Sequence, residues 1–145
     1  MPTHAPPSPD NPSFRFAHLL EVVESDIDAL NHANNVVYVR WVQDVAAAHW
    51  LAAYLPPERN AYVWVVLEHR VRYLRPAHLG DTLRASTWIG ETKGATMQRF
   101  TRIERVSDGA ILCEAESQWC LLDPHTQRPR RVAQTVTDRL RSPLT

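Results

Sequence analysis

The sequence predicts an α+β fold in which a curved antiparallel sheet packs on one long central helix. Between residues 35 and 55, apolar side chains recur at spacings of three and four, which indicates a helix with one apolar face. From residue 67 onwards the period changes to two, and short links that contain glycine separate the successive segments. Such links favour antiparallel hairpins, because a parallel crossover needs a dozen or more residues.

The chain of 145 residues has the size of one domain. Five of its eleven prolines fall in the first twelve residues, interleaved with Ser, Asn and Asp. This composition buries little apolar surface and supports no hydrogen-bonded ladder. We therefore expect a disordered, proline-rich tail over residues 1–13 and a single folded domain over residues 14–145.

The first predicted elements are a strand and the long helix. Apolar residues and a valine pair favour a strand over Phe16–Val23. The helix is expected over Asn35–Leu55, roughly 30 Å long at about 1.5 Å per residue. Asn34 or Asn35 is a suitable N-cap, and the Pro56-Pro57 pair ends the helix. The predicted apolar face consists of Tyr38, Trp41, Val45, Ala48, Ala52 and Leu55.

Four further strands are expected after the helix. Alternating side chains predict a half-buried strand over Leu67–Tyr73, which the Arg75-Pro76 pair ends. The remaining strands are expected over Thr82–Ile89, Ala95–Arg105 and Ala110–Asp123. The predicted order is therefore β-α-β-β-β-β, with the helix as the only element long enough to cover the sheet.

The charge balance and the hydropathy pattern argue against several classes of function. Sixteen basic residues balance sixteen acidic ones, which argues against a protein that neutralises nucleic-acid phosphates over a broad surface. No apolar run approaches the roughly 20 residues of a membrane span, and no secretory signal is evident. We therefore expect a cytoplasmic protein without nucleic-acid or membrane partners. Cys113 and Cys120 lie an odd seven residues apart on the last strand, so they face opposite sides and are expected to be free thiols.

Residues that carry chemistry gather where the chain enters the helix: Asp26, Asp28, His32, Asn34 and Asn35. A helix N-terminus presents unpaired N–H groups and about half a positive charge, which polarise a carbonyl or hold an anion. A carboxylate beside such an oxyanion site suits acyl transfer. No G-x-S-x-G motif of a serine hydrolase is present. A thioester is therefore the plausible acyl substrate, because its good leaving group lets one carboxylate suffice without a Ser-His-Asp triad.

Each of these residues also has a structural interpretation. Asp26 can be a solvated loop charge or a turn former, Asp28 and Asn34 can act as caps, and His32 can be a hydrogen-bonded imidazole. The carboxylates with His32 can alternatively be metal ligands, but no second cluster completes such a site, so no metal is expected. His69 falls on the apolar side of its strand and is expected to be a core-facing structural histidine.

Two segments resemble a known family. Residues 25–38, SDIDALNHANNVVY, are similar to the D-x-D-x-x-x-H-x-N-N-x-x-Y signature of hotdog-fold acyl-CoA thioesterases, the 4-hydroxybenzoyl-CoA thioesterase-like group. Residues 72–81, RYLRPAHLGD, resemble a second segment of that group. The resemblance implies a hotdog fold and a homodimer with active sites at its interface, or a dimer of dimers. Pairing also removes an exposed sheet edge.

The resemblance also implies roles for residues. Asp28 takes the place of the catalytic carboxylate, acting as nucleophile or general base, and His32 matches the histidine that orients the carboxylate or water. Asn35 is expected to be catalytic at the helix start. Asn34 and Tyr38 are expected to bind substrate.

The implied substrate is a thioester of coenzyme A or of acyl carrier protein, and no separate cofactor is expected. Coenzyme A carries several phosphate oxygens, which forked guanidinium contacts bind well. The candidate contacts are Arg75 and Lys93, followed by Arg128, Arg130 and Arg131, although each can equally be a solvated surface charge. The leading hypothesis is an acyl-CoA hydrolase. The alternatives are a non-catalytic acyl-thioester binding protein on the same fold and a metal-dependent hydrolase.

Overall fold

The computed structural model describes residues 14–144. The predicted tail, residues 1–13, lies outside the described residues. Along the chain the elements are β1 (Phe16–Glu21), the short 3₁₀ helix η1 (Glu24–Asp26), α1 (Asn35–Ala53), α2 (Pro56–Arg59), β2 (Val63–Tyr73), β3 (Thr82–Lys93), β4 (Thr96–Arg105), β5 (Ile111–Leu122) and α3 (Gln134–Arg141).

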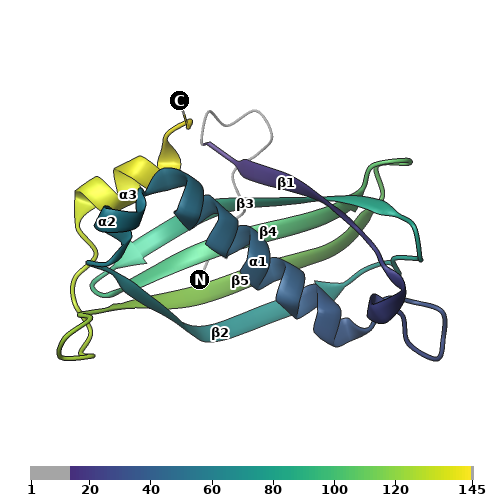
Figure 1. The fold of residues 1–145 in the computed structure, drawn as a ribbon, viewed down its shortest axis with the longest axis horizontal. Coiled ribbons are helices and arrows are strands. Elements are labelled where there is room, and N and C mark those ends of the chain that lie inside the picture. The colour runs from purple at the N-terminus through teal and green to yellow at the C-terminus, as the bar shows by residue number, and fades with distance from the viewer. Residues whose placement is uncertain (1–13, 145) are drawn as a thin grey trace, which may run out of the picture.

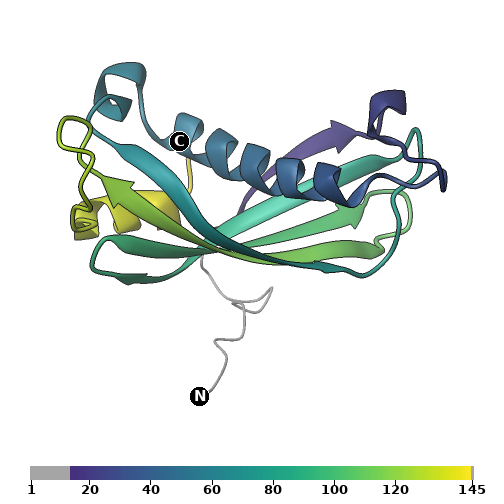
Figure 2. The same cartoon turned by 90° about the horizontal axis from the view of Figure 1, so that it is seen from below.

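The five strands form one antiparallel sheet in the order β1-β3-β4-β5-β2. Figure 1 shows α1 crossing one face of the sheet on a diagonal, and Figure 2 shows the sheet bent around that helix. The predicted α+β class and the hotdog architecture are therefore confirmed. β2 is an edge strand, and β5 is its neighbour in the sheet.

The apolar face of α1 forms the centre of the core. Val37, Tyr38, Trp41, Val42 and Val45 are buried on this face. The same cluster continues into the sheet with Leu83, Ala85, Ile103, Leu112 and Cys113. Cys113 and Cys120 are both buried and free. Burial raises the pKa of the Cys113 thiol to about 12, so this sulfur stays protonated.

Several boundaries differ from the prediction. The first strand ends at Glu21 rather than Val23, because the chain then turns into η1. The long helix ends at Ala53 rather than Leu55: Tyr54 already has an extended backbone, and the prolines that follow disfavour helical geometry before them. Pro56 instead begins the short helix α2.

Two strands are longer than predicted, and besides the short α2 a second helix, α3, was missed. β2 begins at Val63 rather than Leu67, and a register shift between Val66 and Glu68 interrupts its alternation, which hid the first half of the strand. β3 continues past Ile89 to Lys93, with a second irregularity at this point. The eight-residue helix α3 was not predicted, because its buried side is only Val136, Thr137 and Leu140.

Candidate active site

The loop that enters α1 is folded by its own backbone. The Asp28 N–H donates to the His32 carbonyl at 2.9 Å, and the Asn31 N–H donates to the Asp28 carbonyl at 3.0 Å. Asn31 has a φ of 63°, a left-handed conformation that asparagine tolerates better than most residues. Ile27 and Ala33 form an isolated antiparallel bridge across this turn. The loop is therefore a closed unit that holds Asp28 in a fixed place.

Asp28 lines a cavity of ≈ 380 Å³ at the start of α1. Its Oδ1 accepts hydrogen bonds from the Leu30 N–H at 2.9 Å and from the His32 N–H at 3.4 Å. Its Oδ2 has no donor among residues 14–144. One carboxylate oxygen therefore anchors the side chain, and the other is available to a molecule in the cavity.

The first turn of α1 opens on the same cavity. Asn34 is the N-cap, and its Oδ1 accepts from the Val36 N–H at 3.0 Å, while its carbonyl accepts from the Val37 N–H at 2.9 Å. The Asn35 N–H has no acceptor within the described part of the chain. Asn34 and Asn35 both line the cavity. A carboxylate and a free amide at the positive end of the helix dipole therefore share one space.

The opposite wall comes from the end of β2 and the residues after it, with Tyr73, Leu74, Arg75 and Pro76 lining the cavity. Tyr38 joins this wall to α1: its hydroxyl accepts from the Ala77 N–H at 2.8 Å and donates to the Arg75 carbonyl at 3.4 Å. Burial raises the pKa of Tyr38. Because backbone groups already occupy this hydroxyl, the clearest contact of Tyr38 is structural.

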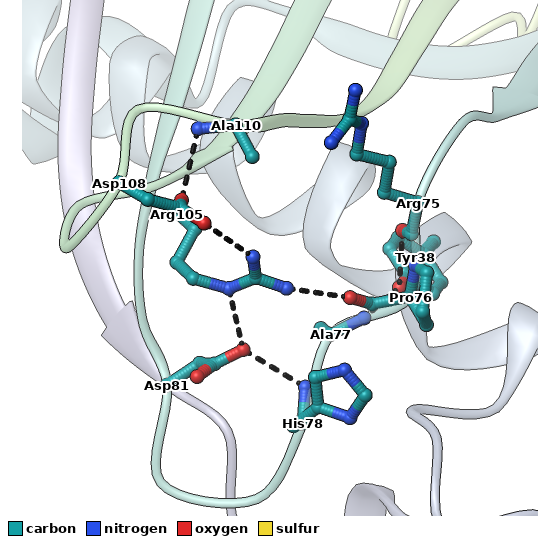
Figure 3. A network of polar contacts seen from close by, with 9 residues as sticks. All are labelled: Tyr38, Arg75, Pro76, Ala77, His78, Asp81, Arg105, Asp108 and Ala110. Atoms are coloured by element: carbon teal, nitrogen blue, oxygen red, sulfur yellow. Dashed lines mark hydrogen bonds and ion pairs between the residues drawn. The ribbon is translucent and has the colours of Figure 1, made fainter.

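An ion-pair network fixes the next loop (Figure 3). Arg105 bonds to Asp81 and to Asp108, both at 2.9 Å, and to the Pro76 carbonyl at 2.8 Å. Asp81 also accepts from the His78 N–H at 2.9 Å. Sequence reasoning missed Arg105, because only the pairing of distant strands brings it to this loop. In Figure 3 the exposed side chain of Arg75 points away from the Arg105 contacts, and the Arg75 carbonyl accepts from the Tyr38 hydroxyl.

His32 reaches the cavity, but its ring stacks edge-on against His78, with ring centroids 5.4 Å apart. Within the described residues, its contact with the Asp28 carboxylate is through the backbone N–H and not through the imidazole. His78 was not singled out from the sequence, although it lies inside the second motif. The structure therefore pairs two imidazoles beside the cavity where one was expected.

Asp26 has a structural place. Its side chain is only 2% exposed and forms an ion pair with Arg40 of α1 at 2.8 Å. It also accepts from the Val23 N–H at 3.0 Å. The interpretation of Asp26 as a solvated loop charge is wrong, because Arg40 compensates the carboxylate and allows it to be buried; the turn-forming interpretation is confirmed.

The other predicted cations lie at the far end of the sheet. Lys93 ends β3, whereas the cavity lies beside the Thr82 end, roughly 37 Å away at about 3.4 Å per residue. Arg130 bonds to the Ala61 carbonyl and lies over the Tyr62 ring. Arg128 and Arg131 are exposed in the same segment. Within one chain, Arg75 alone of the five predicted cations lines the Asp28 cavity.

His69 is half-buried and hydrogen-bonded, with Nδ1 2.7 Å from Ser117 Oγ and Nε2 3.2 Å from Gln43 Nε2. It is therefore a structural histidine, bridging β2, β5 and α1. Among residues 14–144, no three side chains of His, Cys, Asp or Glu are grouped to hold a metal ion. None of the helices in this range is both long and apolar enough to cross a membrane.

Comparison with known proteins assigns the family. Residues 22–140 match the sequence model of the thioesterase-like superfamily. The chain belongs to this superfamily.

Among solved structures, it resembles the Staphylococcus aureus protein SAV2348, which was solved in complex with CoA, with 22% identity, a TM-score of 0.78, and coverage of 88% of this chain and 82% of that one. It also resembles Slr0204, a 1,4-dihydroxy-2-naphthoyl-CoA thioesterase from Synechocystis, with 12% identity, a TM-score of 0.76, and coverage of 88% and 96%. At these identities the likeness concerns the fold.

A plant protein also matches in sequence. The chloroplastic acyl-(acyl-carrier-protein) hydrolase FATB3 of Cuphea viscosissima is 30% identical over 74 residues, which are 51% of this chain. The match spans only 18% of that relative's length.

Proposed function

We propose that this chain hydrolyses acyl thioesters to a free acid and a thiol at the Asp28 cavity. The observation that carries the proposal is that two residues line one space of ≈ 380 Å³: Asp28, which has one carboxylate oxygen without a donor, and Asn35, whose N–H has no acceptor among residues 14–144. The family supports it, because superfamily members are named as thioesterases.

The reaction needs a polarised carbonyl and an activated nucleophile. With the thioester oxygen at the Asn35 N–H, the helix dipole stabilises the negative charge that develops there. Asp28 then acts in one of two ways. As a general base it takes a proton from water, the water oxygen bonds to the carbonyl carbon, the C–S bond breaks, and the thiolate leaves and takes up the proton. As a nucleophile its oxygen bonds to the carbonyl carbon, the C–S bond breaks and the thiolate leaves; water then hydrolyses the acyl-aspartyl anhydride and supplies the proton that the thiolate takes up.

The position of Arg75 at the cavity favours a substrate whose thiol carrier has phosphate groups. Its exposed guanidinium at the cavity suits a phosphate of coenzyme A or of the phosphopantetheine arm of acyl carrier protein. The names of the relatives point to both carriers: one structure was solved with CoA, and the plant relative is a hydrolase of acyl carrier protein esters. We propose Asn34 and His32 as further groups around the reacting ester, and Lys93 as a contact that only a second subunit brings close.

We further propose a homodimer, alone or within a tetramer, paired through the edge strand β2. Val63, Leu67 and Tyr73 are exposed on this strand, Leu67 at 60%. An unpaired edge with apolar side chains is stabilised by pairing. The two free thiols fit a cytoplasmic location, which we propose as well. Sedimentation velocity at micromolar concentration tests the assembly, and a monomer throughout contradicts it.

The activity is tested with a panel of acyl-CoA and acyl carrier protein esters, with released thiol measured by a chromogenic disulfide. The panel should include short, long and aromatic acyl groups. We expect multiple turnover of at least one ester. Saturable binding without turnover across the whole panel would overturn the proposal in favour of a binding protein.

A further inference from the structure

A second cavity, of ≈ 240 Å³, lies between the second half of α1 and the sheet. Its walls are mainly aromatic: Trp50 of α1, Tyr62, Trp64 of β2 and Trp119 of β5, with Met97 of β4. Arg99 of β4 also lines it. We refer to this space as the aromatic pocket.

The charge of Arg99 has no counter-charge in the described part of the chain. The side chain is only 3% exposed, and its Nη1 donates to His49 Nδ1 and Thr87 Oγ1, both at 3.0 Å. Burial, and then the charge of Arg99, lowers the pKa of His49 to about 3, so this partner is neutral. Burial lowers the pKa of Arg99 to about 9, which leaves it protonated at neutral pH. Nε and Nη2 have no acceptor among residues 14–144.

Two further donors at the pocket lack an acceptor. The indole Nε1 atoms of Trp64 and Trp119 are both buried without a hydrogen-bond partner in the described structure. Buried polar groups are normally paired, and a buried charge is costly unless an opposite charge compensates it. A buried cation without a counter-charge among apolar walls is the complement of an apolar molecule that carries an anionic oxygen.

We propose that the aromatic pocket binds an apolar chain or ring through a carboxylate, with Arg99 as the specificity-determining residue. A carboxylate matches the free face of a guanidinium better than other common anions of apolar ligands, because it accepts two parallel hydrogen bonds. Two sources supply this chemistry: the far end of an acyl substrate, or a free carboxylic acid.

The first source rests on the proposed function. Asn35 begins the helix at the Asp28 cavity, and Ala46 and Trp50 line the aromatic pocket. These positions lie 11 to 15 residues further along α1, which is roughly 17 to 22 Å at about 1.5 Å per residue. A long acyl group with a carboxylate at its far end has this reach. The free acid as a source does not depend on hydrolysis at Asp28.

Calorimetric titration of the full chain with octanoate and with 1-octanol tests the pocket directly. We expect octanoate to bind at least tenfold more tightly than 1-octanol. Arg99→Met keeps an unbranched apolar stem and removes the charged guanidinium, and it should weaken octanoate binding roughly ten- to hundredfold while leaving 1-octanol unchanged. Arg84→Met, at an exposed position of β3, is the matched control and should change neither.

Arg99→Lys keeps the positive charge and removes the forked pair of donors, so it gives a second reading should Arg99→Met fail to fold. We expect it to weaken octanoate binding several-fold. Equal affinity for the acid and the alcohol, or octanoate binding unaffected in both variants, overturns the proposal.

Hydrolysis distinguishes the two sources. A preference of the native chain for acyl-CoA esters with a terminal carboxylate, lost in Arg99→Met, identifies the acyl substrate. Arg99-dependent octanoate binding without that preference identifies the free acid. If no thioester is turned over but Arg99-dependent octanoate binding persists, the pocket is supported and the proposed function is contradicted. Turnover of a thioester without octanoate binding supports the proposed function and contradicts the pocket.

Discussion

Asp28→Asn separates the chemistry of the carboxylate from its structural part. An asparagine Oδ1 still accepts from the Leu30 and His32 N–H groups, so the loop keeps the two bonds that hold it. The change removes the negative charge and the basic oxygen that faces the cavity. Because general bases contribute roughly 100- to 10,000-fold, we expect kcat/KM to fall by that factor, about 3–5 kcal/mol in the barrier.

Stability should hardly change. With the anchoring bonds retained, the free energy of unfolding is expected to stay within about 0.5 kcal/mol, a shift of roughly 1–2 °C in Tm. The assay is thiol release from the best ester of the panel, together with thermal unfolding of the same preparation. Asp44→Asn, on the exposed side of α1, is the matched control and should retain full activity. An Asp28→Asn variant that is folded and as active as the native chain would refute the reasoning.

Three further predictions follow from contacts around the site and the core. Tyr38→Phe should lower the free energy of unfolding by about 1–3 kcal/mol, because the buried Ala77 N–H loses its acceptor. Tyr73→Phe removes an exposed hydrogen bond and should lower that free energy by less than about 0.5 kcal/mol. Equal losses for the two variants in urea unfolding would contradict this prediction. The pKa of His49 is about 3 in the folded chain, against an ordinary value of 6.5. Between these values the unfolded chain binds a proton that the folded chain does not. The free energy of unfolding should therefore decrease as the pH is lowered from 6.5 to 3, by at most about 1.4 kcal/mol per pH unit. His49→Asn, which keeps an acceptor for its neighbour, should flatten this slope in urea titrations, and an unchanged slope counts against it. Arg75→Met should raise KM for acyl-CoA roughly three- to tenfold at low salt with little change in kcat, and an unaltered KM would remove this side chain from carrier binding.

Much of the fold follows from local pattern. The N-cap at Asn34 follows from neighbouring residues, and the structure confirms it. Of the predicted apolar face, Tyr38, Trp41 and Val45 are buried. Ala52 and Leu55 are exposed, and Leu55 lies beyond the end of the helix at Ala53. The predicted strand at Leu67 shows the limit of this reasoning, because a bulge shifts the side-chain period and hides the first part of β2. The site motif likewise placed Asp28 and Asn35 at one cavity, since both lie on a single continuous loop and helix start.

What the sequence did not reveal depends on contacts between residues that are far apart along the chain. Arg105 meets Asp81 across 24 residues, and Arg99 meets His49 across 50. Neither pair leaves a periodic signal, because its geometry is set by the register of β3 against β4 and by where α1 crosses the sheet. The orientation of His32 toward His78 has the same origin: two loops meet only in the folded chain.

The pairing of β2 with a later strand determines when the cavity forms during synthesis of the chain. Its C-terminal end supplies one wall of the cavity, yet the strand to which it pairs, β5, ends at Leu122, about 50 residues later. Asp28 and the start of α1 leave the ribosome long before that partner exists. A nascent chain therefore carries Asp28 without the opposite wall of its cavity until β5 has been synthesised and docked, so the cavity is complete only after residue 122 has left the ribosome.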